Sequence, residues 1–64
     1  MKVREVIRRL EEEGWQLVRT KGSHRVDKHS GKPGIVLVPG HVNDDLAPGT
    51  LRGVARQAQL EDLS

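Results

Sequence analysis

Apolar residues recur at helical spacing at both ends of the chain, and the region between them alternates as β-strands do. The two helical stripes consist of Val3, Val6, Ile7 and Leu10 near the start and Leu51, Val54, Ala55 and Ala58 near the end. Residues spaced at i, i+3, i+4 and i+7 lie on one face of a helix. This change of period predicts a helix at residues 2–13 and a second helix that opens at Pro48, with strands between them.

Three segments between the helices have the composition of strands: residues 15–20, 24–29 and 35–38. The last of them is apolar on both faces, which predicts a central or best-buried strand. Val26 is the one clear inward residue of the second segment, and residues 60–64 are predicted to fray. The α-β-β-β-α order predicts one α+β domain over residues 1–64, with two helices on one face of a three-stranded antiparallel sheet.

A thin core limits what such a domain can enclose. The chain has 64 residues, no Cys, Phe or Tyr, and a single Trp, so disulfides and thiolate metal sites are excluded. We therefore expect a functional surface rather than an enclosed substrate cavity. Trp15 follows the first helix, where a lone Trp is more typical of a core anchor than of a base-stacking platform.

Positive charge is concentrated between residues 19 and 32. Five Lys and Arg residues stand there against the single anion Asp27, which gives this segment a net charge of +4 before its histidines are counted. Such a segment suits a polyanionic partner, and it equally suits a sheet edge protected from aggregation. No apolar run is long enough to cross a bilayer or to form a signal-peptide core, so we expect a cytoplasmic protein with no membrane partner.

The stretch Thr20–Arg25 combines the groups that RNA cleavage without a metal requires. His24 is the side chain best suited to move a proton near neutral pH, and Lys21, Arg25 and Lys28 can hold phosphate. Ser23 can orient a phosphate oxygen, and Gly22 permits a close backbone approach.

The second proton-transfer group stays open at this point. His29, His41, Lys21, Lys28 and a water molecule are all candidates. The histidines have no metal-ligand spacing, so we expect neither a metal nor another cofactor. Two further alternatives also stay open: a module that binds RNA without cutting it, and an interaction module whose basic face docks an acidic partner.

Several spaced motifs together resemble the HicA toxins of HicA–HicB toxin–antitoxin systems. The motifs are Gly14-Trp15, Lys21-Gly22-Ser23-His24, Val38-Pro39 with His41, and Pro48-Gly49-Thr50-Leu51-Arg52. The resemblance covers about residues 3–60 and implies a fold similar to the double-stranded-RNA-binding domain, in agreement with the α-β-β-β-α order. It also implies an mRNA interferase, an endoribonuclease that cuts mRNA and arrests growth. It places the family's essential histidine on His24, and it implies a HicB-type antitoxin as the protein partner.

Overall fold

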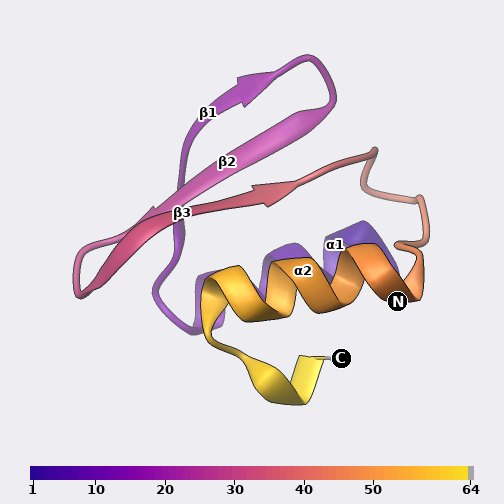
Figure 1. The fold of residues 1–64 in the computed structure, drawn as a ribbon. Helices are drawn as coiled ribbons and strands as arrows, with labels where there is room; N and C mark the ends of the chain where they lie inside the picture. Colours follow the sequence, from indigo (N-terminus) through magenta and orange to yellow (C-terminus); the bar gives the residue numbers. More distant parts are fainter. Residues whose placement is uncertain (64) are drawn as a thin grey trace.

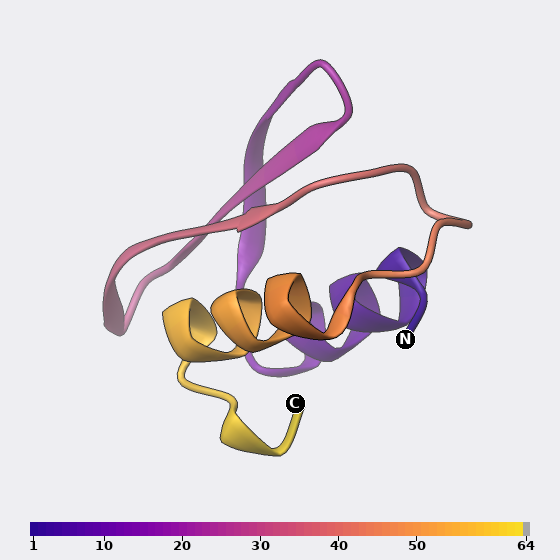
Figure 2. The ribbon, with the colours of Figure 1, turned by 45° about the vertical axis from the view of Figure 1, so that its right-hand side comes forward.

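The computed structural model describes residues 1–63 and has the predicted α-β-β-β-α order. The elements are α1 (Val3–Glu12), β1 (Gln16–Lys21), β2 (His24–His29), β3 (Lys32–Val38), α2 (Pro48–Ala58) and a short 3-10 helix, η1 (Glu61–Leu63). The strands form one antiparallel sheet in the order β1-β2-β3. Both helices lie on one side of this sheet (Figures 1 and 2), so the predicted α+β fold is confirmed.

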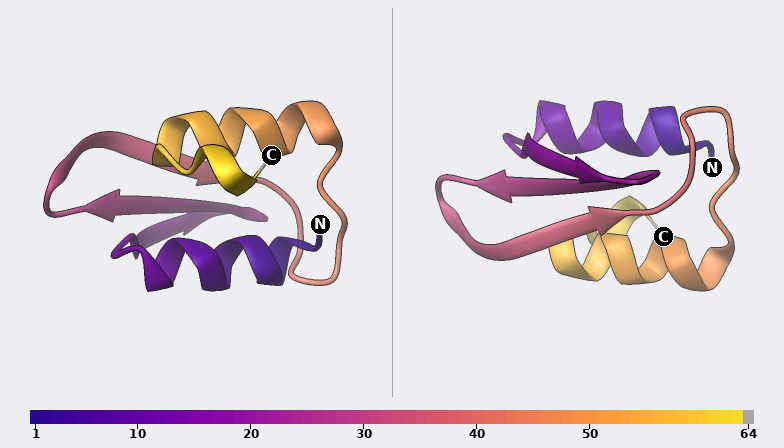
Figure 3. Two further views of the ribbon diagram at one scale, coloured as in Figure 1. Left: turned by 90° about the horizontal axis from the view of Figure 1, so that it is seen from below. Right: turned by 90° about the horizontal axis from the view of Figure 1, so that it is seen from above.

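The core lies between the helix layer and the covered face of the sheet. The two helices run side by side in the same direction (Figure 3). Their buried stripes meet β3 in a cluster that includes Val6 and Leu10 of α1, Val36 of β3 and Val54 of α2. Trp15, only 1% exposed, joins this cluster, which confirms its role as a core anchor.

The prediction that residues 35–38 form the central strand is wrong: β2 is central, and β3 is an edge strand. Only one face of β3 meets the helices, so Val36 and Val38 are fully buried while Ile35 and Leu37 remain 42% and 41% exposed. The turn before β3 is also shorter than the Gly- and Pro-rich sequence suggests, because β3 already begins at Lys32. An edge strand tolerates Pro33, since no neighbouring strand needs its missing N–H on the open side.

The faces of β2 are the reverse of those expected from its one apolar residue. Asp27 pairs in register with buried Val36 and is itself 0% exposed, so Asp27 points toward the helix layer. Val26 pairs with half-exposed Leu37 and lies on the open face, although it is only 5% exposed. Because side chains alternate along a strand, Arg25 lies on the same face as Asp27, and His24 lies on the same face as Val26.

The predicted fraying of the C-terminal segment is wrong for residues 60–63, and Ser64 lies outside the described residues. Gln59 adopts a left-handed conformation (φ 59°), which ends α2 and turns the chain back. Leu60 and Leu63 are then buried in the core cluster. Arg9 of α1 donates a 2.7 Å hydrogen bond to Asp62, and this bond holds the pKa of that carboxyl below its ordinary value of 3.8.

Candidate functional site

His24 stands at the end of the β1–β2 hairpin, which projects from the helix layer (Figure 1). The connection is the two-residue turn Gly22-Ser23, with Gly22 at φ 63°. A glycine accepts this left-handed conformation without strain. The turn fixes the register in which Lys21 pairs with His24, so the two side chains lie on the same face of the sheet. His24 is exposed.

A hollow of about 540 Å³ lies on the open face of the sheet, and we call it the cationic hollow. Its lining residues are Arg19, Lys21, His24, Val26, Ile35 and Leu37. Within residues 1–63, neither Arg19 nor Lys21 forms an ion pair or a side-chain hydrogen bond. Two unpaired cations beside an apolar floor leave this hollow open to an anionic partner.

A second hollow of about 330 Å³ meets the first at His24 and Leu37, and we call it the edge pocket. Its other lining residues are Pro39 after β3 and Thr50, Gly53, Val54 and Gln57 of α2. The pocket follows the outer edge of β3, where the backbone N–H of Leu37 donates a 3.0 Å hydrogen bond to Oε1 of Gln57. The Gln57 side chain thus accepts from a backbone N–H of an edge strand that would otherwise be unpaired.

Arg25 does not join His24, although it is the next residue. Its Nε donates to Oδ1 of Asp27 at 2.8 Å, and one of its terminal nitrogens donates to Glu11 of α1 at 3.2 Å. Both carboxylates lie toward the helix layer, so the Arg25 guanidinium points to that side of the sheet and is paired there. Lys28 is exposed on the His24 face of β2, but at four residues along the strand it stands about 13 Å away.

His29 is engaged in the structure through both ring nitrogens. The N–H of Gly31 donates to Nδ1 at 2.8 Å, so Nε2 carries the proton and donates to the carbonyl of Glu13 at 2.9 Å. The ring also packs edge-on against Trp15, with centroids 5.3 Å apart. His41 lies in the loop after β3 and lines neither hollow that contains His24. Within residues 1–63, Lys21 is the one side chain considered for the second proton transfer that lines either of these two hollows together with His24.

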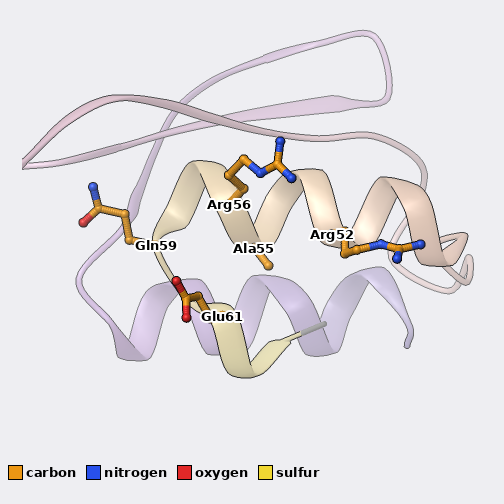
Figure 4. A pocket seen from close by; sticks show the side chains of 5 residues that line it. All are labelled: Arg52, Ala55, Arg56, Gln59 and Glu61. Atoms are coloured by element: carbon orange, nitrogen blue, oxygen red, sulfur yellow. The ribbon is translucent and has the colours of Figure 1, made fainter.

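A further hollow of about 360 Å³ lies away from His24, between α2 and η1. Arg52, Ala55, Arg56, Gln59 and Glu61 line it. Figure 4 shows that Arg52 and Gln59 point away from each other and that the labelled side chains do not converge. This hollow therefore lacks the arrangement of a binding site, in which several polar groups converge on one point.

The sequence did not single out three residues that the fold brings to His24: Arg19, Thr50 and Gln57. Arg19 could have been found from strand alternation, because it lies two residues from Lys21 in β1. Thr50 belongs to the motif Pro48-Gly49-Thr50-Leu51-Arg52, but no local signal assigned either α2 residue to the site. Within residues 1–63, no group of three or more His, Cys, Asp or Glu side chains could hold a metal ion, and no helix is long and apolar enough to cross a membrane.

These features define a small α+β domain with an exposed histidine beside unpaired cations on an open sheet face. A family model described as "HicA toxin of bacterial toxin-antitoxin" matches residues 3–60. The chain therefore belongs to the HicA toxin family, and as the toxin of such a system it has an antitoxin as its partner. No curated protein gives a significant match.

Proposed function

We propose that this toxin is a metal-independent endoribonuclease that cuts mRNA and uses His24 as its acid–base residue. One observation carries the proposal: exposed His24 stands where the cationic hollow meets the edge pocket, within reach of unpaired Lys21. A phosphodiester bound beside these cations lies next to an imidazole, a side chain that can act as a general acid or base.

The proposed reaction is an internal transesterification. A base removes the proton from a ribose 2′-hydroxyl, and that oxygen forms a new bond to the adjacent phosphorus. The bond from phosphorus to the 5′-oxygen breaks, and an acid protonates the departing oxygen. The products are a 2′,3′-cyclic phosphate and a 5′-hydroxyl, and His24 acts as the base or the acid.

The residues around His24 support the negative charge that develops on the phosphate. Lys21 shares the hollow with His24, and Arg19 extends the positive surface along β1. Cations placed at this point stabilise the transition state more than the ground state. The Gly22-Ser23 turn supplies a hydroxyl and a backbone that RNA can approach closely, since nothing lies within 4 Å of the position that a Cβ on Gly22 would take.

Arg25 and Lys28 are both predicted to hold phosphate, but neither contacts the reacting phosphate in this proposal. Arg25 is left out, because its guanidinium faces Asp27 and Glu11. Lys28 contacts RNA away from the reacting phosphate, because it is exposed on the His24 face but lies farther along β2.

The partner in this proposal is a HicB-type antitoxin that covers the same open face. Ile35 and Leu37 are about two-fifths exposed there, next to Arg19 and Lys21. An acidic partner with an apolar centre complements such a surface in charge and hydrophobicity. Covering His24 would then block access to RNA.

The direct test is cleavage of a single-stranded mRNA by the purified protein in the presence of EDTA. We expect the parent and His41→Ala to cut and His24→Ala to lose cleavage. His41→Ala is the matched control, because it removes an exposed histidine that lines neither hollow containing His24. Product ends should be a 2′,3′-cyclic phosphate and a 5′-hydroxyl, and a 2′-deoxy substitution at the scissile nucleotide should block the cut.

A non-catalytic RNA-binding module is the second candidate, favoured by the unpaired cations of the cationic hollow alone. It predicts RNA binding without cleavage by either the parent or His24→Ala. Cleavage by His24→Ala at the parent rate would contradict the role of His24.

A further inference from the structure

The edge pocket differs in chemistry from the cationic hollow that it meets. Apart from the shared His24, its lining contains no charged side chain. Leu37, Pro39 and Val54 supply apolar walls, and Gly53 leaves one side open, with nothing within 4 Å of the position that its Cβ would take. A largely apolar cavity with a few fixed polar groups is typical of a small-ligand site.

Gln57 supplies a hydrogen-bond donor of fixed orientation to this pocket. A backbone N–H can only donate, so the 3.0 Å bond from Leu37 requires the amide oxygen of Gln57 to face the strand. The amide NH2 group is thereby directed away from that N–H. Within residues 1–63 the NH2 group has no hydrogen-bond partner, so its two donors remain available where Gln57 lines the pocket.

Thr50 adds a hydroxyl on the same side of α2. Helix α2 begins at Pro48 without a side-chain cap, so Thr50 is not engaged in capping. Val54, 3% exposed, anchors this part of the helix in the core. The two polar groups are therefore presented by a rigid element, as specificity determinants are.

The position of the pocket indicates its ligand. A phosphodiester at His24 has a nucleotide on each side, and the phosphates of the strand are drawn to Arg19 and Lys21 in the cationic hollow. The uncharged pocket on the other side of His24 suits a nucleobase, which is flat, apolar on its faces and polar on its edges. Within residues 1–63, neither hollow is lined by Phe, Tyr or Trp, and their one aromatic ring is that of His24, which the proposed function assigns to proton transfer. Base recognition in the edge pocket therefore depends on hydrogen bonds.

We propose that the edge pocket binds the nucleobase next to the scissile phosphodiester of single-stranded mRNA, and that Gln57, with Thr50, selects this base. The proposal rests on the proposed function, since it assigns the sequence preference of the same cut. At the edge that carries the purine C6 or pyrimidine C4 substituent, a fixed NH2 donor favours the carbonyl oxygens of guanine (O6) and uracil (O4) over the amino groups of adenine (N6) and cytosine (N4).

The test uses oligoribonucleotides in which only one residue carries a free 2′-hydroxyl, so that a single bond can be cut. The bases on either side of this bond are varied in turn, and the rates of cleavage are compared. Gln57→Glu keeps an oxygen acceptor for the N–H of Leu37 and replaces the NH2 donor by a second acceptor. Gln59→Glu is the control, because it introduces the same charge at the end of α2, outside the edge pocket.

We expect Gln57→Glu to change the rate ratio of guanine and uracil over adenine and cytosine on the order of tenfold, in favour of adenine and cytosine. We expect Gln59→Glu to leave the ratio unchanged. The proposal is overturned if Gln57→Glu slows all substrates by one common factor, or if the control shifts the ratio equally.

A binding measurement separates failure of the pocket from failure of the nuclease. A fully 2′-O-methylated oligonucleotide, which cannot be cut, is added to ¹⁵N-labelled protein, and the side-chain amide signals of Gln16, Gln57 and Gln59 are followed. The pocket proposal predicts the largest shift for Gln57, even if the protein proves unable to cleave RNA. If RNA binds at saturation and the Gln57 amide does not shift, the edge pocket is not a base site.

Discussion

Replacement of Arg25 by Met tests whether this residue holds the fold together or holds the substrate. Asp27 is 0% exposed, and its one ion pair is the 2.8 Å contact between its Oδ1 and Nε of Arg25. Within residues 1–63 its second oxygen, Oδ2, has no hydrogen-bond partner. Arg25→Met keeps the aliphatic volume and removes the charge, so it leaves a buried carboxylate uncompensated.

The expected loss is large for so small a domain. Removal of one partner of a buried pair costs about 3–5 kcal/mol, and the lower end applies here because 16% of the Arg25 side chain is exposed to screening solvent. A domain of 64 residues has roughly 3–10 kcal/mol of stability in total. A loss of about 3 kcal/mol corresponds to a fall in Tm of roughly 12–24 °C.

The assay is urea unfolding followed by the fluorescence of Trp15, the one Trp of the chain. The double variant Arg25→Met with Asp27→Leu should recover most of the loss, since it removes the buried charge together with its partner. Glu11→Gln is the control: the Glu11 side chain is 59% exposed, so its pair with Arg25 should contribute less than about 1 kcal/mol.

Two results would refute this structural role for Arg25. One is a loss below about 1 kcal/mol in Arg25→Met, which would mean that Asp27 does not depend on its partner. The other is a stable Arg25→Met protein with selectively weakened RNA binding. That outcome would return Arg25 to the phosphate contacts.

Three further predictions follow from other parts of the molecule. Asp62→Asn should lower the stability of the fold at neutral pH, and its difference from the parent should vanish on acidification. Because the pKa of Asp62 is depressed, the bond from Arg9 stabilises the fold above about pH 3.8 and ceases to do so as the pH falls through the depressed value. Urea unfolding at several pH values checks this expectation. Gly14→Ala should destabilise by about 2 kcal/mol in thermal unfolding, because the residue has φ 94° and a Cβ would lie 2.7 Å from Nε2 of His29. Lys21→Gln should reduce the slope of log Kd for RNA against log salt concentration by about 0.7–1, as expected for one lost phosphate contact.

The sequence predicted the elements well, because long periodic stripes such as Val3–Leu10 have few alternatives. It failed where one residue had to be assigned to a face from its polarity alone. The run Ile35–Val38 was predicted to be central because all four residues are apolar, yet two of them remain more than 40% exposed on the open face. A half-covered sheet next to a functional surface can expose apolar side chains, and periodicity cannot distinguish this case from double burial.

The same ambiguity bears on Arg25, which the sequence predicts to hold phosphate. The only apolar residue of β2, Val26, was expected to point inward; it is buried at 5% exposure, but it lies on the open face and not against the helices. Polarity could not reveal that Asp27 is the residue buried on the helix side, because a charged residue is buried only where a partner compensates it. Arg25 is that partner and is committed to the helix side, so the cations left beside His24 are those of β1, Arg19 and Lys21.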